Sequence, residues 1–240
     1  MRIALISDVH ANIVALEAVV AAAGSVDAFW HTGDIVGYGP EPDAVVERLA
    51  GLGAIGVRGN HDAAAVGSET VEYFNVDARR AIEWTAGVIS GATRAWLAGL
   101  PETRVEDDLT LVHGSPRAPI WEYITTTALA RAGFDALSTR NGIFGHTHIP
   151  LAYRLVGGTV QAVAQRDGSV LRLDDAPVLL NPGSVGQPRD GDPDASFAVL
   201  DIDARIVTWH RVPYDVAATQ AAMRAVSLPP RLVERIAHGR

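Results

Sequence analysis

The sequence predicts an α/β (α+β) fold in which two mixed β-sheets pack face to face with helices outside. Residues 1–58 alternate short apolar runs with helical patterns, and from residue 109 the pattern becomes rich in short strands and turns. The chain has 240 residues, 48% hydrophobic and 20% charged, which is ordinary globular composition. No repeat, low-complexity linker or composition break marks a boundary, so we expect one domain over residues 1–240.

The first 58 residues predict three strands and two helices. Strands are expected at residues 2–7, 28–34 and 54–58. Between them lie helices at residues 12–23, with Asn12 as the N-cap, and at residues 42–52. This order implies parallel strands joined by right-handed crossovers. In such sheets ligands gather where the strands end.

The rest of the chain predicts helices first and strands later. Residues 63–108 read as helical and either wall the candidate site or pack on the sheet. Further strands are expected at residues 109–112, 142–144 and 178–180, with hairpin turns at 157–158 and 167–168 and a hairpin over 196–211. Helices are expected at residues 78–89, 93–100, 126–137 and 215–226, and residues 229–240 look like a peripheral tail.

Two absent residue types exclude several kinds of chemistry. Because the chain has no cysteine, disulfides, thiolate zinc sites and cysteine nucleophiles are impossible. All twenty basic residues are arginine, which excludes lysine Schiff bases and the phosphate-binding loop that needs lysine. Carboxylate, imidazole, amide and hydroxyl groups remain for chemistry, and these suit hard or borderline metal ions.

Charge and hydropathy set expectations about partners and location. The formal net charge of -8 argues against stable nucleic-acid binding and against an anionic membrane as partner. No apolar segment approaches the roughly 18 residues that a membrane-spanning helix needs. The first residues run directly into Asp8 without a cleavable signal pattern, so we expect a cytoplasmic protein. The sequence leaves a homo-oligomer open.

Polar residues that can bind metal follow several of the predicted strands. Five of the eight histidines stand at strand-to-loop junctions, within three residues of Gly, Asn or Asp. In an extended chain the i, i+2 pair His146 and His148 projects both rings to the same side, as two metal ligands would. The motifs are Asp8-Val9-His10, Gly33-Asp34, Gly59-Asn60-His61-Asp62, His113-Gly114 and Gly145-His146-Thr147-His148. Together they predict a two-metal site that hydrolyses phosphate esters.

With these motifs the chain resembles the calcineurin-like metallophosphoesterases. The resemblance spans residues 1 to about 190 and includes every ligand position of the family pattern. Within the family the chain is most similar to small single-domain bacterial and archaeal phosphoesterases of the phosphodiesterase type. The loop that begins Asn181-Pro182-Gly183-Ser184 is similar to one they carry near the site. The resemblance implies a four-layer αββα sandwich.

The resemblance also implies which residues hold the metals. One ion would be held by Asp8, His10 and His148, the other by Asn60, His113 and His146, with Asp34 bridging both. Two such ions can make hydroxide available at neutral pH for attack on phosphorus. We expect two divalent metal ions and favour manganese, with iron, zinc, cobalt or nickel as alternatives.

Catalytic and substrate-binding roles are expected for four further residues. His61 follows the ligand Asn60 and is expected to protonate the leaving group, while Asp62 fixes the tautomer of its ring. Asn12 and Arg58 are candidate contacts to phosphate. Helix capping would explain Asn12 without any function, and a salt bridge would explain Arg58.

The expected function is metal-dependent hydrolysis of phosphodiester or phosphomonoester bonds in a small phosphorylated substrate. A protein Ser/Thr phosphatase or a dinucleoside polyphosphate hydrolase is the alternative within the superfamily. Those relatives typically continue the second motif as Gly-Asp-x-x-Asp-Arg-Gly, whereas residues 33–40 here contain no arginine. A non-catalytic scaffold with the same fold is the alternative of another class, but such members have lost ligands that are present here.

Overall fold

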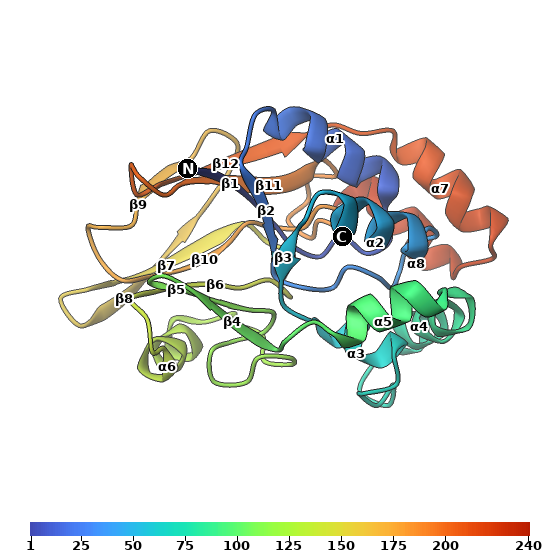
Figure 1. The fold of residues 1–240 in the computed structure, drawn as a ribbon, viewed down its shortest axis with the longest axis horizontal. Helices are drawn as coiled ribbons and strands as arrows, with labels where there is room; N and C mark the ends of the chain where they lie inside the picture. The colour runs from blue at the N-terminus through green and yellow to red at the C-terminus, as the bar shows by residue number, and fades with distance from the viewer.

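Two six-stranded mixed sheets lie face to face in the computed structural model, which describes residues 1–240 (Figure 1). The first sheet has the order β3 (Ile55–Gly56), β2 (Ala28–His31), β1 (Arg2–Ile6), β11 (Ala195–Asp201), β12 (Ile206–Val212) and β9 (Val170–Arg172). The second has the order β4 (Thr103–Glu106), β5 (Leu109–Val112), β6 (Asn141–Ile143), β10 (Val178–Asn181), β7 (Leu151–Val156) and β8 (Thr159–Ala164).

The pleat of β1 shows how the layers form. Ile3 and Leu5 point into the core between the two sheets, whereas Ala4 and Ile6 point into the core under the helices. The helices α1 (Ile13–Ala23) and α2 (Pro42–Gly51) cover the first sheet, and α6 (Thr127–Ala136) covers the second. The predicted sandwich of two mixed sheets with helices outside is confirmed.

The parallel start of the first sheet is also confirmed. β1 pairs in parallel with β2, and β2 pairs in parallel with β3. β2 and β3 end earlier than the apolar runs suggest, at His31 and Gly56. The reason is that the chain leaves the sheet to build polar loops, in which Asp34 takes a positive φ of 52°. The three strands therefore end together, and their loops emerge on one side.

The segment 63–108 is helical only in part. It contains the second half of α3 (Asn60–Ala65), then α4 (Val76–Val88) and α5 (Gly91–Ala98), which are capped by Asn75 and Ser90. It ends in the strand β4, which pairs antiparallel with β5, so the helical prediction is wrong for Thr103–Glu106. Partner pairing, which local pattern does not reveal, decides the conformation of this exposed edge strand.

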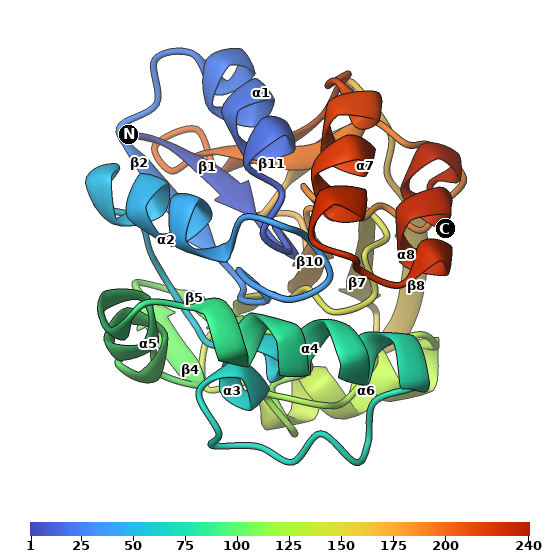
Figure 2. The same cartoon turned by 90° about the vertical axis from the view of Figure 1, so that its right-hand side faces the viewer.

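The C-terminal residues are not peripheral, contrary to the prediction for residues 229–240. After α7 (Val216–Ala225) the chain forms α8 (Pro230–Arg235) and a short 3-10 helix, η1 (Ile236–His238). Leu232, Val233 and Ile236 are buried in one cluster with Tyr38 and Met223. α7 packs against α1 and α8 (Figure 2). Three apolar side chains on one short helical face are enough to anchor the tail.

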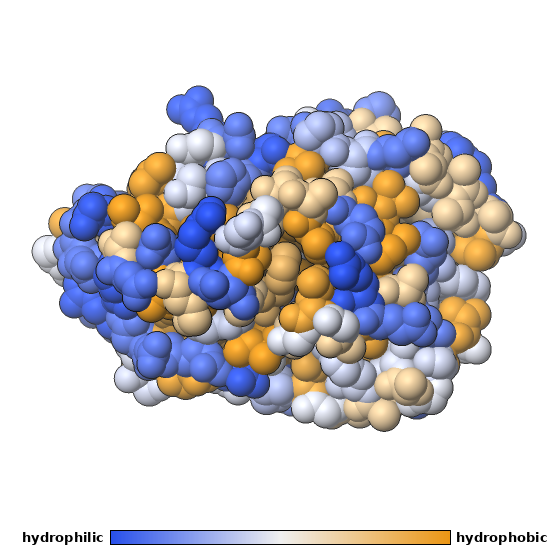
Figure 3. All heavy atoms as spheres, turned by 45° about the horizontal axis from the view of Figure 1, so that its top comes forward, coloured by the Kyte–Doolittle hydropathy of each residue, from blue (hydrophilic) through white to orange (hydrophobic).

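Figure 3 shows mostly hydrophilic residues at the end of the molecule formed by β8 and β9, and a mixture of apolar and hydrophilic residues over the helices. None of the helices combines the length and the hydropathy that crossing a bilayer requires.

Candidate metal centre

Five segments bring the candidate ligands to one place. They follow β1, β2, β5 and β6, or form the start of α3. Every side chain that the resemblance implies as a ligand lies there, and each is at most 3% exposed: Asp8, His10, Asp34, Asn60, His113, His146 and His148. Residues up to 140 positions apart in the sequence therefore share one buried polar cluster.

A first group of ligand atoms comes from Asp8, His10, Asp34 and His148, all within 4.8 Å of one another. Nε2 of His10 lies 3.2 Å from Nε2 of His148 and 3.7 Å from Oδ2 of Asp34. Nε2 of His148 lies 3.2 Å from Oδ1 of Asp8. Two carboxylates and two imidazoles thus face one point.

A second group comes from Asp34, His113 and His146. Nε2 of His113 lies 3.3 Å from Oδ2 of Asp34 and 3.0 Å from Nδ1 of His146. The amide oxygen of Asn60 lies 3.0 Å from the same Nε2. Asp34 belongs to both groups, so one carboxylate joins them.

Main-chain carbonyl oxygens orient each of the four imidazoles. The contacts are Nδ1 of His10 to Val36 at 3.1 Å, Nδ1 of His113 to Thr32 at 2.8 Å, Nδ1 of His148 to Gln187 at 2.6 Å, and Nε2 of His146 to Trp121 at 3.2 Å. The other ring nitrogen is left to face the cluster. Such outer contacts fix the tautomer and direction of metal-binding histidines.

Asp8 tests whether cations fit this cluster. Its Oδ2 accepts hydrogen bonds from the Ser7 hydroxyl at 2.6 Å and from the main-chain N–H of His146 at 3.1 Å. Its Oδ1 is buried and has no hydrogen-bond partner. A buried carboxylate oxygen without a donor is unfavourable unless a cation meets it. Nitrogen and oxygen donors without sulfur suit hard or borderline divalent cations, so the residues fit.

Burial and the charges of neighbouring side chains together set the pKa values in the cluster. Burial lowers the pKa of His10, His146 and His148 well below the usual value, so these rings are neutral at pH 7 and can act as ligands. Burial alone would also lower the pKa of His113, but the Asp34 carboxylate raises it to about 9. Burial would raise the pKa of Asp34, but the nearby histidines hold it below its usual range.

Five of the candidate ligands stand on left-handed backbone. The φ angles are 51° at Asp8, 49° at His10, 52° at Asp34, 64° at His146 and 59° at His148. Residues other than glycine adopt this region at a cost of about 1–3 kcal/mol each. Hydrogen bonds between loops hold the shape, since the N–H of Asp8 donates to Gly33 O and that of His10 donates to Asp34 O, both at 3.0 Å.

Gly59 explains why this motif begins with glycine. A Cβ at this position would lie 2.1 Å from Oδ1 of Asp34 and 2.4 Å from its main-chain nitrogen. Both contacts are far shorter than van der Waals distance, so any larger residue would displace the Asp34 loop. The close approach also lets the N–H of His61 donate to Oδ1 of Asp34 at 2.9 Å.

Asp62 does not contact the His61 ring, contrary to the predicted tautomer-fixing role. Its Oδ1 accepts the N–H groups of Ile35 at 2.8 Å and Val36 at 3.0 Å, and its Oδ2 accepts that of Gly59 at 3.0 Å. The carboxylate therefore joins the loop after β2 to the start of α3. The tetrapeptide turns into a helix directly, which aims Asp62 back at the backbone instead of along the ring of its neighbour.

His61 lies beside the first ligand group. Its ring is 3% exposed, with its centroid 4.9 Å from the His10 ring and 4.8 Å from the Phe74 ring. Its Nδ1 is buried without a hydrogen-bond partner. Burial lowers the pKa of His61 to about 4, against the opposing charge of Asp34. Phe74 places one aromatic side chain of the segment 63–108 against this ring.

The two candidate substrate contacts both have structural partners. The Asn12 oxygen caps α1 by accepting the N–H of Ala15 at 3.1 Å, and its amide donates to Gly186 O at 3.1 Å. Asn12 is 1% exposed, and both polar groups of its side chain have partners within the protein. The Arg58 guanidinium lies 3.5 Å from Glu102 in an ion pair. The sequence around Asn12 and Arg58 does not reveal whether each side chain binds another part of the protein or a phosphate.

Sequence reasoning missed several residues around the cluster. The Tyr38 ring lies 4.6 Å from the His10 ring and 4.3 Å from the His61 ring, and the Tyr123 ring stacks on His146 at 3.7 Å. Arg189 lies in the loop after β10, and Arg235 lies in the tail expected to be peripheral. The Gly-rich turn around Tyr38 follows the second motif directly, and this position indicates that Tyr38 lies near the cluster. No sequence pattern indicates the same for Arg235.

The loop after β10 joins two of the ligand-bearing loops. The Asn181 amide donates to Gly145 O at 2.7 Å, and the Ser184 hydroxyl donates to Asp8 O at 2.7 Å. The N–H of Gly186 also donates to Asp8 O, at 3.0 Å. The sequence singled out this loop, and its contacts place it directly behind the cluster.

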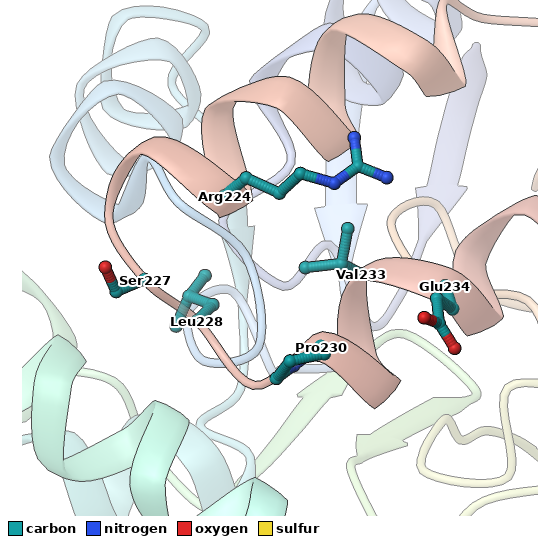
Figure 4. Close-up of a pocket in the computed structure, with 6 residues that line it drawn as sticks. All are labelled: Arg224, Ser227, Leu228, Pro230, Val233 and Glu234. Carbon is teal, nitrogen blue, oxygen red and sulfur yellow. The ribbon is translucent and has the colours of Figure 1, made fainter.

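Two cavities lie near the C-terminal helices. One of 370 Å³ opens between α7 and α8 and contains none of the candidate ligands (Figure 4); its lining is Arg224, Ser227, Leu228, Pro230, Val233 and Glu234. The other has only 10 Å³, about the space of one water molecule. It lies between the cluster and the tail, lined by His10, Asn12, Tyr38, Gly39, Gly186, Gln187, Thr219, Met223 and Ile236.

Comparison with known proteins identifies relatives along the whole chain. The sequence profile described as the calcineurin-like phosphoesterase superfamily domain matches residues 1–205. A crystal structure of a metallophosphoesterase from Sphaerobacter thermophilus is 47% identical, with a TM-score of 0.92 and coverage of 100% of both chains. An uncharacterised protein from Methanocaldococcus jannaschii is 35% identical over 99% of this chain and 98% of its own length.

A more distant relative matches in part. The symmetrical bis(5′-nucleosyl)-tetraphosphatase of Pectobacterium carotovorum is 30% identical over 133 residues. The match includes 53% of this chain and 47% of that protein.

Proposed function

The chain belongs to the calcineurin-like phosphoesterase superfamily, and on this basis we propose that it is a metal-dependent hydrolase of small phosphate esters. The observation that carries the proposal is the position of Asp34, which belongs to both groups of potential ligand atoms. A carboxylate shared between two sites is what a pair of divalent cations about 3.5–4 Å apart requires.

We infer how the ligands divide. One cation would be held by Asp8, His10 and His148, the other by Asn60, His113 and His146, with Asp34 common to both. Bound there, divalent cations would offset phosphate charge and acidify a water molecule so that it can attack phosphorus at neutral pH. Manganese is our first choice, and iron, zinc, cobalt and nickel fit the same donors.

His61 is our candidate for the group that assists the leaving oxygen. Its ring lies beside His10, and its Nδ1 has no partner in the protein. Its main chain is tied to Asp34, so the ring is held at a fixed place relative to the cluster. An anionic substrate beside the ring would raise its pKa in the same direction as Asp34 does, which favours proton donation.

Hydrolysis of dinucleoside polyphosphates is the second candidate. It is favoured by the partial match to the bis(5′-nucleosyl)-tetraphosphatase. Residues 33–40 lack the arginine that the second motif of such hydrolases typically carries, which speaks against this candidate. A cation for polyphosphate would have to come from another part of this chain.

A substrate panel on metal-reconstituted protein tests the proposal. The compounds are 4-nitrophenyl phosphate, bis(4-nitrophenyl) phosphate, a cyclic nucleotide, bis(5′-adenosyl) tetraphosphate and a phosphopeptide. We expect turnover of at least one small ester with manganese, and no turnover by the Asp34→Asn variant. Protein that stays inert towards every compound with each of the five metals would overturn the proposal and favour the scaffold alternative.

A further inference from the structure

Two half-buried arginines lie side by side next to the candidate metal centre. Arg189 belongs to the loop after β10, and Arg235 is the last residue of α8. Both guanidinium groups donate to Oε1 of Gln187, Arg189 at 3.0 Å. Both also lie over the Tyr38 ring, at 5.8 Å for Arg189 and 4.8 Å for Arg235. Burial and the charge of Arg189 lower the pKa of Arg235.

The arginine pair is close to the ligand cluster. The Tyr38 ring that both cations contact also contacts the rings of His10 and His61. The main-chain N–H of Arg189 donates to His148 O at 3.3 Å. After burial, the charge of Arg189 is the next largest cause that lowers the pKa of His148. The positive charge of the pair therefore acts directly on the place where phosphate would react.

Neither arginine of the pair makes an ion pair with a carboxylate. Eight other arginines make ion pairs with carboxylates, whereas neither Arg189 nor Arg235 does. The Nε atoms of both arginines and Nε2 of Gln187 are buried and have no hydrogen-bond partner. Gln187 is 1% exposed, and its neutral Oε1 accepts hydrogen bonds from both guanidinium groups. Adjacent, partly desolvated guanidinium groups without an ion-pair partner are unfavourable, so the protein alone does not account for this arrangement.

We propose that Arg189 and Arg235 bind a second phosphate of the substrate while its scissile phosphate lies at the metal centre. The planar fork of a guanidinium matches phosphate oxygens, and two forks can hold one phosphate from two sides. The substrate class that follows carries at least two linked phosphates, such as a nucleoside or dinucleoside polyphosphate. This inference rests on the proposed function, but Arg235 lies outside the residues that match the family profile.

Kinetics on metal-loaded protein test the pairing through a ratio. We would measure kcat/KM for bis(5′-adenosyl) tetraphosphate and for 4-nitrophenyl phosphate, which has a single phosphate. The ratio is the value for the tetraphosphate divided by the value for 4-nitrophenyl phosphate. Arg235→Gln should lower this ratio about tenfold or more, as expected for lost hydrogen bonds to a charged group. Arg235→Lys keeps the charge without the fork and should lie between. Arg231→Gln, on an exposed residue of the same helix, is the matched control and should leave the ratio unchanged.

Binding separates this inference from the proposed function. Calorimetry with inorganic pyrophosphate and inorganic phosphate, in buffer with manganese in excess, measures the affinity of each anion without any turnover. The preference for pyrophosphate over phosphate should fall about tenfold in Arg235→Gln, even if the protein hydrolyses nothing. Equal weakening of both anions would place the arginines on the scissile phosphate and overturn the inference. So would an unchanged preference in a variant whose thermal unfolding matches wild type.

Discussion

The main-chain N–H of His61 donates a 2.9 Å hydrogen bond to Oδ1 of Asp34, while Oδ2 of Asp34 lies 3.3 Å from Nε2 of His113. One carboxylate thus fixes the candidate acid on one side and both ligand groups on the other. A substitution at Asp34 should weaken cation binding more than it lowers the stability of the fold, because the Asp34 side chain points into the cluster and not into the apolar core.

Asp34→Asn should lower the number of bound divalent cations from two per chain to one or none. The amide keeps the size of the side chain but removes the negative charge that two adjacent cations share. Metal analysis after reconstitution and desalting measures this number. Asp135→Asn, on an exposed face of α6, is the control and should keep both cations. Two tightly held cations in Asp34→Asn would show that Asp34 does not bridge.

His61→Ala should keep its cations and lose turnover by about 10²–10⁴-fold, the usual range for general acid catalysis. The loss should be smallest for 4-nitrophenyl esters, whose leaving group needs little help from a proton. Steady-state rates divided by measured metal content check this expectation, with His238→Ala, an exposed histidine near the C-terminus, as the control. If the variant instead releases its cations while the rate per bound pair is unchanged, His61 has no such role.

Asp62→Asn should destabilise the protein by about 1–3 kcal/mol. An asparagine oxygen can still accept the N–H groups of Ile35 and Val36, but its NH₂ group would face the N–H of Gly59, leaving a buried donor unsatisfied. Asp62→Ala loses all three bonds and should cost more. Urea unfolding measures both. Unchanged stability together with a shifted pH–rate profile would return Asp62 to the catalytic role that its position beside His61 first suggested.

His31 should make stability depend on pH. Burial lowers the pKa of this ring from 6.5 to about 3, and neither ring nitrogen has a hydrogen-bond partner. Between these two pKa values the unfolded chain binds a proton that the folded chain does not, so stability falls as pH falls below about 6.5. Above pH 6.5 the ring contributes no slope.

The His31→Phe variant isolates that contribution. Between pH 6 and 4, the free energy of unfolding should fall less steeply in this variant than in wild type, by about 1.4 kcal/mol per pH unit. Urea titrations of both proteins at several pH values measure the slopes. Equal slopes would mean that the folded protein protonates His31 readily.

Sequence reasoning worked best where a residue's role is visible from its neighbours in the chain. Asp215 was expected to begin a helix and caps α7, and the 109–112 run is the strand β5. It failed where a distant partner decides. Thr103–Glu106 is a strand because β5 lies beside it, and Asp62 binds backbone that precedes it by 26 and 27 residues.

The surroundings of the cluster show the same limit. The motif spacing identified the side chains that meet, because each motif ends a strand and parallel strands end together. It gave no sign that the tail would return to Tyr38, since α8 is only six residues long and its apolar face is small. Arg235 therefore became visible only through the packing of Leu232, Val233 and Ile236.

The left-handed backbone at five of the candidate ligands has a consequence for how cations come and go. Hydrogen bonds between loops, such as that from the N–H of His10 to Asp34 O, hold these unfavourable angles. The free-energy cost of these φ angles is therefore part of the free energy of folding, and it does not recur each time a cation binds. We therefore expect release and uptake of cations to leave the shape of these loops unchanged.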